Sequence, residues 1–213
     1  LAGCAARPAG LARPNGVAPA AGGGAYVMDF GNYRLVQTSP EGKVVQSIGA
    51  FGSAADQIFF GWDVAVDSAG NLYICNQVRD NANPTHDGVK EYSPSGNFLR
   101  EIGAVDYPAD AGRYNSPYGL DVDSAGRVYT ADFGTATVRV FDPQGQPLGA
   151  LFGHLGSGDG QFNGLSDVAV DDANSLLYVS DNFNSRVQQF KLSFEGGAVK
   201  ATFVRAFGVY GRG

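Results

Sequence analysis

The stretch SPYGLDVDSAGRVYTADFG, residues Ser116 to Gly134, decides the fold of this protein. It contains two short apolar runs, LDVD and RVYTAD, separated by the turn sequence DSAG. Short apolar runs bounded by turn residues are typical of β-strands, and a turn Gly tolerates the positive φ that such turns need. The stretch carries no nucleophile arrangement, metal cluster or phosphate-binding loop, so it predicts a structural unit.

The same unit occurs four times along the chain. The residues that end its second apolar run are Asp29, Asn76, Asp132 and Asp181, at spacings of 47, 56 and 49. The second copy is longer because it has seven extra residues between its second and third runs. A period of about 50 residues in four-strand units is typical of β-propellers.

Each unit predicts four strands, a to d, and no segment has helical periodicity. Strand b is apolar almost throughout, as expected when both faces of a sheet are covered by neighbouring blades. We therefore expect an all-β propeller in residues 14–213, preceded by a linker at 1–13. The expected repeats cover about 14–52, 61–103, 117–153 and 165–208.

The stretches PYGLDVDSAGRVYTADFG, DFGNYRLVQ and DNFNSRVQQF share a pattern that includes residues 32–35 and 184–187. These stretches resemble the repeats of the NHL family, which takes its name from that four-residue position. The third repeat departs from the pattern at residues 135–138, where it reads TATV. The resemblance implies a six-bladed ring, so the four blades visible here are expected to be a fragment of one.

The composition excludes some partners. The formal charge of −6 and the lack of a basic stripe argue against nucleic acid, which is bound through clustered Lys and Arg. Cys75 lies in the apolar run NLYICN and is expected to be a buried core residue. Cys4, in LAGC, resembles the lipidation site of bacterial lipoproteins, which would anchor the protein in the cell envelope; a chance match in an Ala/Gly-rich linker is the alternative.

Alternating antiparallel strands place the d–a linkers and the b–c loops on one face of the propeller. That face holds the long linkers at 103–116 and 153–164 and the inserted loop of the second repeat. Long irregular loops on a rigid scaffold are where binding is expected, so this is the predicted functional face. The residues predicted to bind a partner through the inserted loop are Arg79, Asp80, Asn81, Asn83 and His86.

A second candidate site lies where the first residues of strand a border the central channel. The residues predicted to bind a ligand at this face are Trp62, Asp63, Tyr118, Asp121, Asp167 and His154. Converging carboxylates suit a hard cation such as Ca²⁺, and a Zn²⁺ ion also remains open. The alternative is that the aspartates accept hydrogen bonds from backbone N–H groups.

Other polar residues have structural interpretations. Asp29, Asp132 and Asp181 end strand b before FGN-like sequences, which predicts Asx-type turns, with Arg34 and Arg186 as ion-pair partners. The two histidines, His86 and His154, are too few for a three-ligand zinc site and are expected to be solvated.

The predicted function is a non-catalytic binding scaffold for a protein or small ligand, without a cofactor, in the bacterial cell envelope. A membrane would be contacted only through the lipid anchor. Two alternatives remain: a metal-assisted lyase or lactonase with its site at the channel mouth, and an RNA-binding NHL domain. Fold alone does not decide among them.

Overall fold

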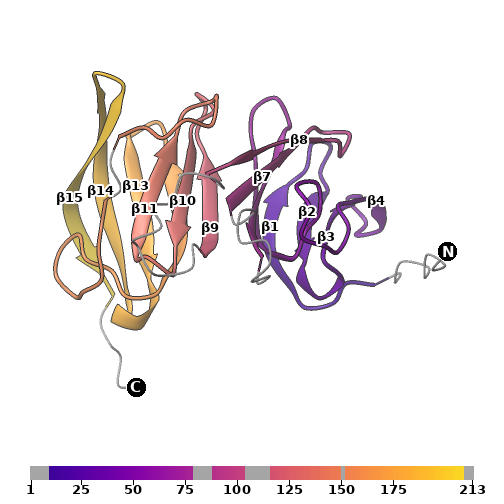
Figure 1. Ribbon diagram of the computed structural model, residues 1–213, viewed down its shortest axis with the longest axis horizontal. Coiled ribbons are helices and arrows are strands. Elements are labelled where there is room, and N and C mark those ends of the chain that lie inside the picture. The colour runs from indigo at the N-terminus through magenta and orange to yellow at the C-terminus, as the bar shows by residue number, and fades with distance from the viewer. Residues whose placement is uncertain (1–9, 79–87, 104–115, 150–151, 209–213) are drawn as a thin grey trace.

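A computed structural model describes residues 10–78, 88–103, 116–149 and 152–208. Its described residues form antiparallel β-sheets that stand side by side, from the N-terminal sheet on the right of Figure 1 to the C-terminal sheet on the left. Cys4 and the residues predicted to bind a partner through the inserted loop (Arg79, Asp80, Asn81, Asn83 and His86) lie outside the described residues.

Each repeat folds into one sheet whose strands follow chain order. The first sheet contains β1 (Pro14–Pro19), β2 (Ala25–Asp29), β3 (Arg34–Thr38) and β4 (Val44–Ile48). The second contains β5 (Phe60–Val66), β6 (Leu72–Gln77), β7 (Gly88–Tyr92) and β8 (Phe98–Ile102). The third contains β9 (Pro117–Val122), β10 (Val128–Asp132) and β11 (Thr137–Phe141). The fourth contains β12 (Leu165–Asp171), β13 (Leu176–Asp181), β14 (Arg186–Glu195) and β15 (Ala198–Phe207).

The third sheet has three regular strands among the described residues, and residues 150–151 of the segment after β11 lie outside them. The described part of this segment pairs antiparallel with β11 through bridges at Pro147 and Phe152. Leu148 N–H donates to the carbonyl of Val140 (2.8 Å), and Val138 and Phe152 exchange two backbone hydrogen bonds (2.9 and 3.2 Å). The carbonyl of Leu148 also accepts a hydrogen bond from the backbone N–H of Val199 (3.2 Å), which joins the segment to the β14–β15 hairpin.

The first strand of each sheet lies next to the first strand of the following sheet. β1 packs beside β5, β5 beside β9, and β9 beside β12. β6 and β10 are buried along their whole length, whereas β13 alternates between buried and half-buried residues. The second and third sheets are therefore covered on both faces by other blades, and one face of the fourth sheet has no described blade against it.

The hydrophobic core lies between the blades. The buried apolar residues form three clusters, and each cluster joins residues of two successive sheets. Met28 and Ile74 meet between the first two blades, and Cys75 and Leu120 between the second and third. Cys75 is a free, buried cysteine, which confirms its predicted role as a core residue.

Two glycines let the innermost strands approach closely. A Cβ atom added at Gly16 of β1 would lie 2.5 Å from the Cα atom of Asp63 on β5. A Cβ atom at Gly119 of β9 would collide in the same way with the backbone of Asp167 on β12. Gly16, Asp63, Gly119 and Asp167 occupy the same position in successive repeats, so Gly and Asp alternate from blade to blade. The Gly of one blade leaves space for the Asp of the next blade.

In the part of the chain that the structure describes, no helix is long and apolar enough to cross a membrane.

Candidate functional site

The innermost strands of the four blades line a common groove of about 360 Å³. Its lining residues come from β1, β5, β9 and β12: Val17, Ala18, Pro19, Asp63, Val64, Ala65, Val66, Leu120, Asp121, Asp167 and Val168. The structure therefore brings three of the predicted ligand-binding residues, Asp63, Asp121 and Asp167, to one groove, as expected for strands a that line a channel.

The groove carboxylates accept hydrogen bonds from backbone N–H groups. Asp63 accepts one from Leu120 of the next blade (3.1 Å), and Asp121 accepts one from Val170 of the blade after (2.8 Å). Asp167 accepts one from its neighbour Val168 (2.8 Å). Two of these bonds link adjacent blades, so the carboxylates have a role in blade packing whether or not they also bind a ligand.

The groove raises the pKa values of these acids. Burial, together with the negative charges of Asp167 and Asp121, outweighs the hydrogen bond from Leu120 and raises the pKa of Asp63 from 3.8 to about 7. Removal from water likewise raises the pKa values of Asp121 and Asp167 above 3.8. A carboxyl group with a pKa near neutrality can exchange a proton under physiological conditions.

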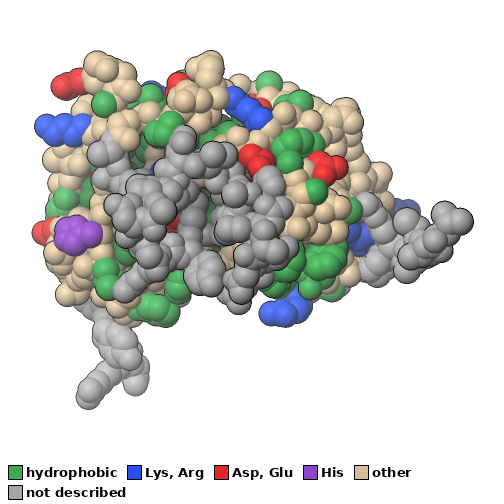
Figure 2. Space-filling model, viewed as in Figure 1, with side chains coloured by type: hydrophobic (Ala, Val, Ile, Leu, Met, Phe, Trp, Pro, Cys, Tyr) green, Lys and Arg blue, Asp and Glu red, His purple; other side chains and the backbone are tan. Residues whose placement is uncertain are grey.

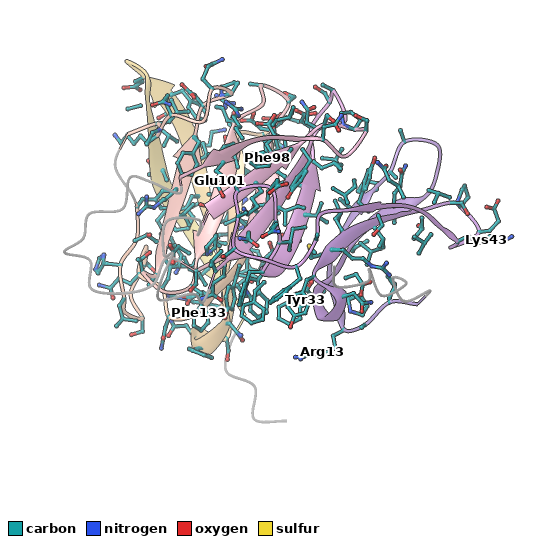
Figure 3. The ribbon with its side chains drawn as sticks, turned by 45° about the vertical axis from the view of Figure 1, so that its right-hand side comes forward. Arg13, Tyr33, Lys43, Phe98, Glu101 and Phe133 are labelled. Carbon is teal, nitrogen blue, oxygen red and sulfur yellow. The ribbon has the colours of Figure 1, made fainter. Side chains whose placement is uncertain are left out.

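A second feature lies on the face that carries the b–c loops and d–a linkers. Here aromatic side chains from all four repeats form a continuous series of ring contacts, which we call the ring row. Its members are Phe51, Phe59, Tyr33, Phe60, Phe30, Trp62, Tyr118, Phe133 and Phe183. In Figure 3 the labelled members Tyr33 and Phe133 lie along the lower edge of the molecule, with Arg13 below them and Phe98 near the opposite end.

The centre of the ring row is a stack. The rings of Trp62 and Tyr118 lie 4.3 Å apart at 28°, and those of Tyr118 and Phe133 lie 4.7 Å apart at 20°. Phe30 continues the row, at 4.9 Å from Trp62, and Phe183 ends it at 5.8 Å from Phe133 in an edge contact. Offset-stacked and edge-to-face pairs are the favoured aromatic geometries, so the contacts stabilise one another.

The b–c turns hold the rings in place. Asp29 accepts hydrogen bonds from Arg34 Nε (2.8 Å) and Asn32 Nδ2 (2.8 Å), and this fixes the 3₁₀ turn Phe30–Asn32 from which Phe30 projects. Asp181 accepts the equivalent bonds around Phe183. The predicted pairing of Asp29 with Arg34 and of Asp181 with Arg186 is therefore confirmed.

The third repeat builds the same turn without an arginine. Asp132 Oδ1 accepts hydrogen bonds from the backbone N–H groups of Gly134 (2.9 Å), Thr135 (3.1 Å) and Ser116 (3.2 Å). Phe133 N–H donates to the carbonyl of Ser116 (3.0 Å), which sets this ring against Tyr118. The departure from the family pattern at residues 135–138 thus leaves the ring position intact.

The ring row is partly open to solvent. Most of its rings are half-buried, while its outer members Phe51 and Phe183 are 57% and 60% exposed. Hydrophobic side chains are visible along the lower edge of the space-filling view, on either side of the grey segments (Figure 2). Fully stacked rings that served only the core would be covered, so the row presents an apolar surface.

Polar groups border the ring row. Trp62 Nε1 donates to Gln77 Oε1 (3.4 Å), and the Arg13 guanidinium lies 5.3 Å from the centre of the Phe30 ring. The hydroxyls of Tyr33 and Tyr118 form no hydrogen bond with another described residue.

His154 lies apart from the groove. It is exposed in the linker before the fourth blade, where its Nε2 lies 3.0 Å from Gln161 Nε2. Among residues 10–78, 88–103, 116–149 and 152–208, no three His, Cys, Asp or Glu side chains come together in a way that could hold a metal ion. The ligand-binding role of the predicted site residues stays a prediction.

Of the ring row, the sequence predicts a ligand-binding role for Trp62 and Tyr118 alone. The signal for three others was present, because Phe30 and Phe133 directly follow the strand-b Asp and Phe183 follows one residue later. Their stacking could not be foreseen, since it depends on which residues of different blades come together in space.

Comparisons with known proteins agree with the fold. No family model matches the chain. The protein named brain tumor of Drosophila melanogaster is 28% identical over 136 residues, which are 63% of this chain and 12% of that protein. A streptogramin B lyase structure superposes with a TM-score of 0.61 at 13% identity, over 88% of this chain and 53% of that one.

Two further solved structures superpose similarly. An inactive H270A virginiamycin B lyase of Staphylococcus aureus, solved with quinupristin, gives a TM-score of 0.62 at 14% identity, over 93% of this chain and 56% of that one. A protein from Lactobacillus plantarum gives 0.63 at 15% identity, over 92% and 55%. The chain thus spans a little over half the length of these solved chains and 12% of the Drosophila relative.

The sheets and these structural neighbours define the chain as an all-β protein of the β-propeller class. At these identities the superpositions concern the fold alone. The resemblance of the repeats to NHL repeats has weaker support, from the Drosophila relative.

Proposed function

We propose that the protein is an NHL-type propeller that binds a protein or small ligand through the face carrying the b–c loops and d–a linkers. The ring row is the observation that carries this proposal. It collects aromatic rings from all four repeats on one face and leaves them partly exposed, although the core between the blades is already filled. Aromatic side chains are the residues that dominate the energy of binding surfaces.

The charge of this surface limits the classes of ligand that it can bind. Among the described residues, Arg13 is the one cation that lies over a ring of the row, and the chain as a whole carries −6. Binding of single-stranded nucleic acid combines base stacking with a basic groove that follows the phosphates. The rings could stack with bases, but no basic groove accompanies them among the described residues, and this favours an uncharged ligand over RNA.

The single tryptophan of the chain gives a direct test, because Trp62 lies inside the ring row. Tryptophan emission would be followed while tryptophan-free peptides, neutral oligosaccharides and oligonucleotides are added in turn. We expect a saturable change with an uncharged ligand and none with oligonucleotides at physiological salt. A response to oligonucleotides alone would refute the proposal in favour of nucleic-acid binding.

The cellular location is part of the same proposal. Lipidation of Cys4 in LAGC would tether the propeller to a bacterial membrane and leave the ring row free to meet other envelope components. Fatty-acid labelling of cells that express the full-length protein should be lost in Cys4→Ser. Label that persists in this variant would show that Cys4 is not the lipidation site.

Catalysis is the second candidate, favoured by the groove acids. Asp63, with a pKa of about 7, is suited to proton transfer and lies in an accessible groove. A solved structural neighbour is a virginiamycin B lyase with quinupristin, so quinupristin is the substrate to try. Turnover that disappears in Asp63→Asn would establish the enzyme; absence of turnover would leave the binding function.

A further inference from the structure

We propose that the ring row binds an extended, proline-rich peptide in the polyproline II conformation. This inference rests on the proposed binding function and names the class of its ligand. It follows from four properties of the row: the direction of its rings, their spacing, the hydrogen-bond donors beside them, and its charge.

The rings of the central stack are half-buried, and their mutual stacking leaves chiefly the ring edges for contact with a ligand. Trp62, Tyr118 and Phe133 are nearly parallel, at 28° and 20°, so the faces of these rings are largely occupied by their neighbours. A flat ligand therefore cannot lie on the ring faces in the middle of the row. The exposed edges form a ribbed apolar surface, which fits aliphatic groups such as proline rings that settle across and between the ribs.

The spacing of the ribs matches an extended peptide. Successive centroids in the stack are 4.3 and 4.7 Å apart. A polyproline II helix rises about 3.1 Å per residue with three residues per turn, so one turn advances about 9 Å. The two steps from Trp62 to Phe133 span up to about one turn, which lets the same face of the peptide meet every second ring.

The donors beside the rings match the needs of such a peptide. A polyproline II helix has no internal hydrogen bonds, so its carbonyl groups seek outside donors. The hydroxyls of Tyr33 and Tyr118 form no bond with another described residue, and Arg13 lies over Phe30. Aromatic surfaces with such donors bind proline-rich segments in several domain families, at a low entropic cost because the peptide is already extended.

The charge of the row supports a neutral peptide. The aspartates of the b–c turns, Asp29, Asp132 and Asp181, are fully buried and hydrogen-bonded, so they do not reach a bound ligand. Among the residues that the structure describes, Arg13 is the cation that lies over a ring of the row. An apolar peptide with exposed carbonyls is the partner that this surface complements.

The test uses a peptide of four Pro-Pro-Leu repeats, with a Gly-Ser peptide of equal length as control. Binding to the wild-type protein would be followed by Trp62 emission and by calorimetry. Tyr118→Ala and Phe133→Ala are each expected to weaken binding about tenfold or more, as for central interface aromatics. Leu99→Ala is the matched control, because Leu99 is 49% exposed on β8, away from the ring row. The affinity of this variant for the proline peptide should stay within about twofold of the wild-type affinity.

Tyr118→Phe is a second control, because it keeps the aromatic ring and removes only the hydroxyl. It shows whether the effect of Tyr118→Ala comes from unfolding or from the loss of a binding contact. It should unfold at the wild-type temperature and weaken binding by less than Tyr118→Ala does. Equal binding by the proline peptide and the Gly-Ser peptide, or equal effects of Leu99→Ala and Tyr118→Ala, would overturn the proposal.

The same assay separates this inference from the proposed function. A neutral oligosaccharide that binds in a Tyr118-dependent way, while the proline peptide does not, would refute the ligand class and leave the binding scaffold standing. If no peptide or oligosaccharide depends on the ring row, both proposals fail.

Discussion

At the scale of single residues, the position that alternates between Gly and Asp controls how closely the blades approach. Because Gly16 and Gly119 have no side chain, the backbones of Asp63 and Asp167, respectively, can pack directly against them. Asp63 in turn reaches the backbone N–H of Leu120 in the next blade. One repeat position therefore supplies both the space and the hydrogen bonds at the centre of the propeller.

Gly119→Ala should destabilise the protein by about 1–3 kcal/mol, because the added methyl group meets the Asp167 backbone in a packed interface. Gly10→Ala is the control, since a Cβ atom at Gly10 has nothing within 4 Å. Denaturant unfolding of both variants measures the difference. Equal stability of the two variants would contradict the close approach of β9 and β12.

The pKa of Asp63 predicts how stability depends on pH. Because the folded-state pKa is raised from 3.8 to about 7, the folded protein binds a proton that the unfolded chain has released in this range. Stability should therefore fall as pH rises from about 4 to 7, by at most about 4 kcal/mol from this group. Unfolding at pH 5 and pH 8 would measure the decrease.

The variant Asp63→Asn isolates the contribution of this carboxyl group. Its amide oxygen can still accept the Leu120 N–H, but it has no charge to desolvate. We expect a smaller loss of stability between pH 5 and pH 8 than in the wild type. An unchanged loss would mean that other groups cause the pH dependence.

At the scale of elements, the b–c turn is a unit built on a buried ion pair. Asp29 is fully buried and Arg34 is 4% exposed, and the carboxylate is also bonded to the Ala12 N–H (2.6 Å) and the Asn32 side chain. The pair holds Phe30 and Tyr33 at the N-terminal end of the ring row. Loss of the Asp29–Arg34 ion pair should therefore both reduce the stability of the protein and displace rings of the ring row.

Arg34→Met should cost about 3–5 kcal/mol of unfolding free energy, because it leaves the Asp29 charge buried with fewer partners. Lys43→Met replaces an exposed residue with the same side chain and should change stability by about 0.5 kcal/mol or less. Thermal and denaturant unfolding would compare them. Similar losses in both variants would show that the ion pair does not stabilise the turn.

The elements could be predicted from the sequence because their signals are local. The apolar runs and the DSAG and SPEG-like turns indicate strands b and c wherever they recur. The segment expected as the fourth strand of the third repeat bonds to β11 at Leu148 and Phe152. Its additional bond to Val199 of β15 could not be predicted, because it joins residues about 50 positions apart that a repeat alignment does not compare.

At the scale of the whole molecule, the groove and the ring row differ in how far they could be foreseen. Asp63, Asp121 and Asp167 were assigned to the channel because strand order alone places strands a together. Trp62 and Tyr118 were found through their proximity to those acids, but the row that extends to Phe51 and Phe183 depends on contacts between blades. The stacking geometry exists only in the assembled propeller.

The central claim is that recognition takes place at the ring row. The most direct measurement is photo-crosslinking in cells, with benzoylphenylalanine in place of Tyr118 in one variant and in place of Leu99 in another. We predict light-dependent adducts at position 118, where the ring row would meet its ligand, and none at position 99 on the outer strand β8. Adducts at position 99 with none at position 118 would contradict the claim.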